Sequence, residues 1–475
     1  MVLATLTIPL IIVKYLMNYN ISYPKSNLPK GRMGWPLVGE TISYLKPHKS
    51  TILGSFLQEH CSNYGKVFKS NLFGCSTIVS CDHELNTFVL QNEDKLFESS
   101  YPSAIHGILG KFSMMLVTGE HHRKLRAVAV GFIGKSKSRP DFFAYVEAMT
   151  ISLMDSWKLE PQIAFFKQSK RFTLFVMLKY VMDMEPDDPL APRMLEDFMS
   201  YMKGFVSVPV QIPGTAFARA VKARQRLANT VKEVMRDRVR AGSTNSINRG
   251  DLIDEMIKID DDKLSEDEKV SVALDILLAG YETTSGLMAL VVYFLVQSPL
   301  SIQHLKEEHM AIRMRKMELG EPLNSQDYKQ MNFTSDVIWE ALRCGNLVKF
   351  LHRKAIKEVR FKGRKYEYVI PAGWKVLPVL AGSHLDSSLH PNPTEFNPQR
   401  WDQQEMMKKV IPFGGGSRLC PGGDLGRLET SLFLHHFVLN YRWKVQADES
   451  PLSCPYLDFN RGMLLDIEPL ETGKC

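Results

Sequence analysis

Cys420 lies in a glycine-rich segment, residues 413–422, whose residue types suit the binding of a flat, bulky group. Glycine allows positive φ angles and lets the backbone approach such a group closely. A predicted helix over residues 425–439 follows, so backbone N–H groups near its start can hydrogen-bond the sulfur. Phe413 can cover the sulfur side, and Arg418 can reach an anionic group. We therefore predict a haem-thiolate seat, in which the thiolate is the axial ligand and favours O–O cleavage.

An apolar segment upstream of this cysteine is long enough to cross a whole domain as one helix. Ser265 and Glu268 have the spacing of a capping box, and apolar residues dominate from there to Ser298, just before Pro299. At 1.5 Å per residue this helix would be roughly 50 Å long. A membrane span is the alternative for residues 287–296, but the charges upstream and the short continuous apolar run argue against it.

The middle of that helix combines small residues with an acid and a hydroxyl. Ala279 and Gly280 leave room on one face, and Glu282 and Thr283 stand beside the gap. Thr284 follows, and consecutive β-branched residues disfavour a helix slightly. We expect the helix to open here, so that the gap holds dioxygen and the acid feeds protons to it. Alone, the segment is equally typical of an ordinary packed helix.

Three charged residues predict a brace near the cysteine segment. Glu340 and Arg343 are three residues apart and share one helix face. Such pairs usually lie at the surface and contribute little to stability. Arg400, however, stands in a proline-bounded loop shortly before the cysteine segment, where it can join them.

Together these segments resemble the cytochrome P450 superfamily. The cysteine segment matches its F-x-x-G-x-R-x-C-x-G signature, residues 279–284 match its A-G-x-E-T-T helix, and residues 340–343 match its E-x-x-R helix, with Arg400 as the arginine partner. With the proline-rich segment near residue 30, the resemblance covers nearly the whole chain. It implies a mainly α-helical haem-thiolate fold with a small β-rich lobe. It also implies a monooxygenase that inserts one oxygen atom into a C–H bond, and a structural role for the brace beneath the haem.

The resemblance assigns the roles around the reacting oxygen. Cys420 would ligate the iron of haem b as a thiolate. Thr283 would hydrogen-bond the activated oxygen, and Glu282 would relay protons to it from solvent. Ala279 and Gly280 would leave space for dioxygen and substrate.

The resemblance also places the remaining haem contacts. His122 and Arg126 match the family's W-x-x-x-R pattern with His in place of Trp, so Arg126 should bind a haem propionate. Arg353 and Arg418 resemble two further propionate ligands. The predicted cofactor contacts are Cys420, Phe413, Arg418, Arg126, His122, Arg353, Gly422, Ala279 and Gly280.

Several short stretches narrow the resemblance to one group of plant enzymes that act on steroids, triterpenoids and abscisic acid. These stretches are residues 33–41, 100–102, 107–111, 343–346, 373–378 and 435–436. Within the group the chain most resembles the steroid C-22 hydroxylases of brassinosteroid biosynthesis. That resemblance implies hydroxylation of a plant sterol side chain, with electrons from NADPH through a separate NADPH–cytochrome P450 reductase on the proximal face. Residues 364–368 depart from the group, because its strand turn is several residues shorter.

Other functions remain open at this point. An abscisic acid or triterpenoid hydroxylase would share the same motifs. A haem-thiolate isomerase or dehydratase, and a non-catalytic haem sensor, are disfavoured because neither needs the intact Glu282–Thr283 pair. A membrane scaffold without a cofactor is the remaining alternative, which an absorption spectrum would exclude.

The β-rich lobe and the substrate pocket can also be placed along the chain. Apolar β-type runs at residues 67–72, 75–79, 358–361 and 376–380 predict short strands. The pocket should be large and apolar. Residues 100–116 should form its flexible roof, and residues 204–217 should lie near a membrane entrance.

Composition and charge set the wider limits. The chain has 475 residues, 44% of them hydrophobic, and a net charge of +7, which favours an anionic membrane or an acidic partner protein. Its seven cysteines are scattered without a C-x-x-C pair, which fits a reducing compartment. There is no nucleic-acid motif in the sequence, and we expect a monomer.

The N-terminal region predicts attachment to a membrane. An apolar run over residues 2–13 is broken by Pro9 and followed by Lys14, so it is shorter than an ordinary span. A cleaved signal peptide and a buried element are the alternatives for this run. We expect residues 1–22 to be a membrane anchor, residues 23–40 a proline-rich hinge, and residues 41–475 the haem-thiolate catalytic domain. The implied location is the endoplasmic reticulum membrane, with the catalytic domain on the cytosolic side.

Overall fold

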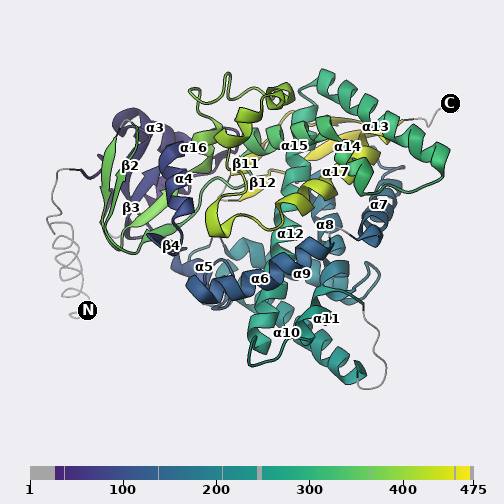
Figure 1. Cartoon of the computed structure of the whole chain (residues 1–475), viewed down its shortest axis with the longest axis horizontal. Coiled ribbons are helices and arrows are strands. Elements are labelled where there is room, and N and C mark those ends of the chain that lie inside the picture. The colour runs from purple at the N-terminus through teal and green to yellow at the C-terminus, as the bar shows by residue number, and fades with distance from the viewer. Residues whose placement is uncertain are drawn as a thin grey trace.

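A helical body and a smaller β-rich region make up the structure, a computed structural model (Figure 1). It describes residues 27–36, 38–136, 139–205, 207–242, 249–364, 366–453 and 456–470. The predicted anchor, residues 1–22, and the start of the predicted hinge therefore lie outside the described residues. The predicted division into anchor, hinge and catalytic domain stays a prediction.

The helices alternate with short strands along the chain. The α-helices are α2 Thr41–Tyr44, α3 Ser55–Tyr64, α4 His83–Gln91, α5 Ser103–Leu109, α6 Gly119–Ser136, α7 Pro140–Asp155, α8 Phe165–Met182, α9 Leu190–Gly204, α10 Ala216–Gly242, α11 Leu252–Ile257, α12 Glu266–Leu295, α13 Pro299–Leu319, α14 Ser325–Gln330, α15 Asn332–Gly345, α16 Leu380–His384 and α17 Gly423–Asn440. The 3₁₀ helices are η1 Pro398–Asp402, η2 Gln404–Lys409 and η3 Gly416–Arg418. The strands are β1 His48–Lys49, β2 Val67–Leu72, β3 Cys75–Ser80, β4 Phe97–Ser99, β5 Gln162–Ala164, β6 Arg353–Ala355, β7 Val359–Lys362, β8 Glu367–Ile370, β9 Lys375–Pro378, β10 Tyr441–Val445, β11 Pro451–Ser453, β12 Leu457–Phe459 and β13 Leu464–Pro469.

The largest sheet has the strand order β2-β3-β9-β6-β4, with β3 and β9 parallel and the other neighbours antiparallel. All four predicted runs form strands, with ends that shift by one or two residues. The segment that looked too long for the family is the turn of the β7–β8 hairpin, in which Lys362 pairs with Glu367. Residues 367 and 368 of this segment belong to β8, and the hairpin forms a two-stranded sheet separate from the large one.

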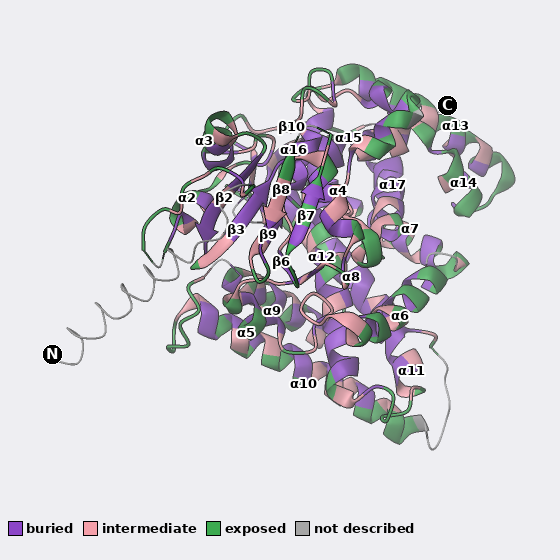
Figure 2. Ribbon diagram, turned by 60° about the vertical axis from the view of Figure 1, so that its left-hand side comes forward, coloured by how far each residue is buried: buried purple, intermediate pink, exposed green. Residues whose placement is uncertain are grey.

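The long central helix α12 begins at the predicted capping box, since Ser265 and Glu268 bond reciprocally. It ends at Leu295, three residues before the predicted end. Among the described helices, α12 is the one long and apolar enough to span a membrane, but 67% of its most apolar window is buried inside the protein. Figure 2 shows it as a largely buried helix within the fold. These features are those of a core helix.

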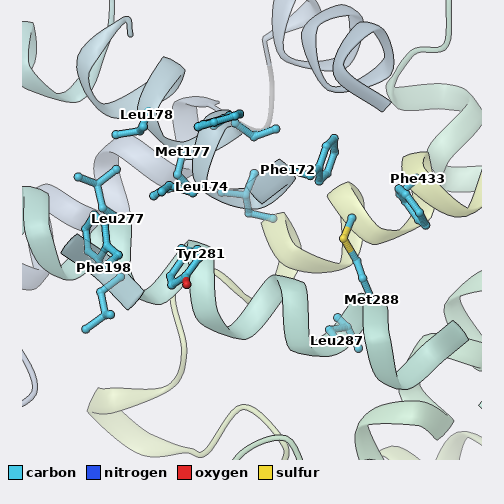
Figure 3. Close-up of a cluster of buried hydrophobic side chains, with 14 of the residues drawn as sticks. Phe172, Leu174, Met177, Leu178, Phe198, Leu277, Tyr281, Leu287, Met288 and Phe433 are labelled. Carbon is cyan, nitrogen blue, oxygen red and sulfur yellow. The ribbon is translucent and has the colours of Figure 1, made fainter. Parts of the chain in front are cut away.

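Packing against α8 fixes the position of α12. Figure 3 shows Phe172, Leu174, Met177 and Leu178 of α8 beside Leu277, Tyr281, Leu287 and Met288 of α12, with Phe198 and Phe433 at the sides. Tyr281 is fully buried, and its ring lies 5.8 Å from that of Phe198. Burying each such side chain stabilises the fold by roughly 1.5–3 kcal/mol. The turn that carries residues 279–283 is thereby held rigidly between neighbouring helices.

The predicted brace is a buried network. Arg343 donates to Glu340 at 2.7 Å, Arg400 donates to the same carboxylate at 2.8 Å, and the Trp401 indole donates to it at 3.1 Å. Burial alone would raise the pKa of Glu340, but the bonds from Arg343 and the charge of Arg400 lower it. Arg343 also donates to the His384 carbonyl at 2.8 Å. Helix α15 is thus joined to the loop that leads into the cysteine segment, and removing one member would leave a buried charge unpaired.

Candidate active site

A cavity of about 1170 Å³ lies between α12, α5, α6 and the cysteine segment. Most of its lining is apolar, with residues from the helical body on one side and from the large sheet on the other. Cys420 lines this cavity together with Thr283 of α12. Because small-molecule pockets usually measure 300–1,000 Å³, the cavity has room for a large planar group and a substrate together.

The cysteine segment is a tight turn that leads into α17. Gly416 has a φ of +64°, and a β-carbon there would lie 2.0 Å from the backbone oxygen of Leu90, so only glycine fits. The Cys420 N–H donates to the Phe413 carbonyl at 3.0 Å and closes the turn. The Phe413 ring packs against Gly423 at the start of α17. This geometry presents the sulfur to the cavity.

Burial raises the pKa of the Cys420 thiol, while the backbone N–H groups of Gly422 and Gly423 and the charge of Arg126 lower it. The backbone N–H groups at the start of the helix therefore lie close enough to the sulfur to affect its pKa. Since burial dominates, the free sulfur favours its protonated form. A bound metal cation would reverse that balance, because coordination deprotonates a thiol outright.

The three predicted propionate ligands converge on one edge of the cavity. Arg126 donates to the Leu419 carbonyl at 2.5 Å. Arg418 donates to Glu93 at 2.6 Å, and Arg353 forms an ion pair with the same carboxylate at 2.5 Å. Glu93 therefore joins two arginines that are 65 residues apart in the sequence (418 minus 353). The sequence analysis missed Glu93, because a lone acid in a polar stretch carries no motif.

His122 lies among these arginines. It is 3% exposed, and its pKa is lowered to about 4 by burial, then by the charges of Arg418, Arg126 and Arg353. The imidazole is therefore neutral at pH 7. Three guanidinium groups around one buried neutral ring leave an excess of positive charge at this edge.

The residues present fit a haem. The Cys420 sulfur faces the cavity, and glycines permit close approach of the backbone. A haem also carries two propionate carboxylates, and three arginines at one edge of the cavity supply the cations that these need. Cys420 would hold the iron, and Arg126, Arg353 and Arg418 would hold the propionates.

Helix α12 does not open at the predicted gap. It is continuous through residues 279–284, and the Thr283 hydroxyl donates to the Ala279 carbonyl of its own helix at 2.7 Å. The space on the β-carbon side of Gly280 belongs to Met177, whose sulfur would lie 2.6 Å from an added β-carbon. The expected opening is wrong for this structure. The physical reason is that tight packing against α8 outweighs the slight helix-disfavouring effect of the threonines.

Glu282 is buried between α12 and α8 rather than linked directly to Thr283. Lys170 of α8 donates to its carboxylate at 2.9 Å. Burial raises the pKa of Glu282, despite the opposing charge and hydrogen bond of Lys170. Its second oxygen is buried and has no hydrogen-bond partner among the described residues. A raised pKa and an unpartnered oxygen are typical of groups that exchange protons, and the relay role of Glu282 stays a prediction.

Two further buried acids reach the cavity and escaped the sequence analysis. Asp275 of α12 accepts hydrogen bonds from the Met114 N–H at 2.6 Å and the Ser113 hydroxyl at 2.9 Å. Burial raises its pKa to about 7, against the effect of these bonds. Burial raises the pKa of Glu429, on α17, to about 8. Helical spacing alone gave no sign that either acid faces inward.

Both predicted pocket segments contribute to the cavity. Tyr101, Ile105 and Met115 come from the predicted roof, and Phe205 and Val208 come from the predicted entrance. Val208 is 73% exposed, so this entrance segment presents an apolar side chain to solvent. Asp275 ties the roof to α12 through residues 113–114.

Fold and site together define a haem-thiolate enzyme. Residues 29–471 match the family described as Cytochrome P450, and the chain belongs to this family. It is a monooxygenase, an oxidoreductase whose family cofactor is haem iron. A solved structure described as retinoic acid bound cyanobacterial CYP120A1 has the same fold. It superposes with a TM-score of 0.82 at 23% identity, over 94% of this chain and 99% of that one.

Among individual proteins, the chain is similar to plant enzymes of this family. It is 50% identical to Cytochrome P450 724B1 of Oryza sativa subsp. japonica over 93% of this chain and 92% of that protein. It is 42% identical to the Steroid (22S)-hydroxylase of Oryza sativa subsp. japonica over 92% and 87%. It is 41% identical to Cholesterol 22-monohydroxylase CYP90B52 of Paris polyphylla over 96% of both chains.

Proposed function

We propose that this enzyme hydroxylates the side chain of a plant sterol at C-22, in brassinosteroid biosynthesis. The observation that carries this proposal is the 41–42% identity, over more than nine-tenths of the chain, to two enzymes named for 22-hydroxylation. The large apolar cavity supports it, because a sterol is an elongated, mostly apolar molecule. The balanced reaction is sterol plus O₂, NADPH and a proton to hydroxysterol, water and NADP⁺.

Four parts of the site would have separate roles in this reaction. Haem, when bound, supplies the activation of dioxygen. Cys420 would hold it through its sulfur, with the Gly422 and Gly423 N–H groups moderating the sulfur's charge. Thr283 would turn its hydroxyl from the Ala279 carbonyl toward the reacting oxygen, and Glu282 would pass it protons. The apolar wall excludes water and positions the substrate.

The electron source and the location belong to the same proposal. Electrons would come from NADPH through a separate NADPH–cytochrome P450 reductase, as the family resemblance implies. The enzyme would reside in the endoplasmic reticulum membrane with its catalytic domain on the cytosolic side. The exposed apolar residues of the entrance segment are compatible with contact to that membrane, and Ile212 among them is 60% exposed.

A substrate panel tests the proposal. The haem-loaded enzyme would be titrated with a C-22-unsubstituted plant sterol, a triterpenoid and abscisic acid, and products would be identified after turnover with NADPH and reductase. We expect a substrate-induced spectral shift and a 22-hydroxylated product with the sterol alone. Cys420→Ser serves as the control, and its reduced, carbon monoxide-bound form should lose the red-shifted haem band. Turnover of abscisic acid or the triterpenoid in place of every sterol would overturn the steroid assignment and leave the monooxygenase class intact.

A further inference from the structure

His352 stands out among the polar groups that line the cavity. It lies between the end of α15 and strand β6, next to Arg353. Its imidazole is enclosed by three aromatic rings, with centroids 5.3 Å away at Tyr101, 5.7 Å at Phe350 and 6.1 Å at Phe73. No described residue forms a hydrogen bond with either ring nitrogen, although the side chain lines the cavity. The side chain is partly exposed to the cavity, so its ring nitrogens are open to a ligand there.

The protonation state of His352 defines the ligand that it can bind. Burial lowers the pKa of the imidazole to about 3, and the charges of Lys375 and Arg353 act in the same direction. The ring is therefore neutral, with one nitrogen as a donor and the other as an acceptor. An alcohol also donates and accepts, so it matches a neutral imidazole better than an ion does.

Several neighbouring polar groups of the cavity are already engaged. Lys375 donates to the Ser100 hydroxyl. The Thr77 hydroxyl donates to the Cys75 carbonyl at 2.9 Å. His352 thus offers free hydrogen-bonding capacity in this part of the wall, together with the Tyr44 phenol, which also has no hydrogen-bond partner among the described residues and which contacts the same Phe73 and Phe350 rings.

The position of His352 suits an elongated ligand. Its ring contacts Phe73, which follows β2 and is 38% exposed, so this side of the cavity approaches the surface of the β-rich region. Thr283 lines the same cavity from α12. A long, rigid molecule can therefore contact His352 near one end and present its other end to Thr283 and Cys420.

We propose that His352 is a specificity-determining residue that hydrogen-bonds the ring hydroxyl of the sterol and so directs its side chain toward Cys420. This inference rests on the proposed function, because a sterol carries its one hydroxyl at the end opposite its side chain. A site that hydrogen-bonds a hydroxyl discriminates against an analogue without it, since the buried partner is then left unpaired.

The test compares two ligands in two proteins. Spectral dissociation constants would be measured for a 3-hydroxysterol and its 3-deoxy analogue, with the haem-loaded wild type and with His352→Leu. A net hydrogen bond is worth roughly 5- to 10-fold in affinity. We expect the variant to bind the hydroxysterol roughly 5- to 10-fold more weakly and the deoxy analogue unchanged. His352→Gln, which keeps a donor and an acceptor, should recover part of the preference.

Thr77→Val is the matched control, because it removes another polar group of the same wall whose hydroxyl is already bonded. It should leave the preference for the hydroxysterol intact, and every variant should retain its carbon monoxide band. If His352→Leu weakens the binding of both ligands equally, or if the preference for the hydroxysterol survives the substitution, the role of His352 is overturned and the proposed function stands. The absence of a response to either ligand in the wild type overturns the proposed function and this inference with it.

Discussion

At the scale of single residues, the site combines features of two kinds. Cys420 and Arg418 stand within one short motif, so their types and spacing identify them in the sequence. Glu93 and His352 act through contacts that only the fold creates, and each looks unremarkable among its sequence neighbours. Glu93 forms ion pairs with Arg418 and Arg353. Two of the three aromatic rings around His352, those of Phe73 and Tyr101, come from distant segments of the chain. Local motifs therefore predict the ligands, whereas the groups that orient or complement them are long-range and were missed.

Thr283→Ala tests the assigned proton delivery at this scale. In the structure the hydroxyl bonds to its own helix, and alanine is the better helix former, so stability should change little. We expect NADPH use to persist, hydrogen peroxide to rise and product per NADPH to fall by roughly tenfold or more, as for loss of a positioned proton donor. NADPH, peroxide and product would be measured together with a C-22-unsubstituted sterol.

Thr284→Ala is the control for this substitution, since it removes the same groups from the next position of the same helix. It should keep the wild-type ratio of product to NADPH. Undiminished product per NADPH in Thr283→Ala would remove Thr283 from the mechanism.

At the scale of elements, the start of the central helix was easier to predict than its interior. The capping box at Ser265 fixes the start of α12 because both of its hydrogen bonds are local. The expected opening near Gly280 depended on a weak propensity, and close packing against Met177 overrides it. The brace of Glu340, Arg343 and Arg400 was predictable because the family motif supplies all three members. Its burial and its bond to Trp401 became visible only in the folded chain.

The buried acid of α17 predicts a pH dependence of stability. The folded-state pKa of Glu429 is about 8, above its ordinary value of 4.5, because burial disfavours the carboxylate. The folded chain therefore binds the proton of Glu429 more tightly than the unfolded chain does. The stability that this proton contributes is present below about pH 4.5 and is lost as the pH rises through 8. Glu429→Gln should remove this loss, so the variant should be more stable than the wild type at pH 8 and similar at pH 5.

Thermal midpoints of the haem-loaded proteins at the two pH values measure the effect, which should be on the order of a few degrees at pH 8. The pKa of Asp275 is also raised, to about 7, so its titration lowers the stability of both proteins over an overlapping pH range. The contribution of Glu429 is therefore read from the difference in thermal midpoint between variant and wild type. Glu405→Gln, at an exposed position of η2, is the control and should change neither midpoint. A wild type and a Glu429→Gln variant with the same pH profile would show that this carboxyl does not titrate in that window.

At the scale of the whole molecule, the fold class followed from few residues because the motifs of this family are spread along the chain. The cysteine segment, α12 and α15 occupy distant parts of the sequence and meet around one cavity. The size of that cavity and the apolar groups at its surface could not be predicted, since both depend on side chains brought together by the fold. Val208 and Ile212 are 73% and 60% exposed, so a membrane contact beside the entrance is physically reasonable.

Deletion of residues 1–22 tests how the molecule attaches to the membrane. Their apolar composition predicts an anchor, whereas the predicted haem contacts all lie beyond residue 121. We expect the truncated protein to keep its carbon monoxide band and to bind vesicles of microsomal lipids more weakly in co-sedimentation. Adding Val208→Asp and Ile212→Asp should reduce the remaining binding, because charges at two exposed apolar positions oppose insertion. Loss of all haem on truncation would place the segment in the folded core. Full binding after truncation, abolished by the two aspartates, would make the entrance segment the main anchor.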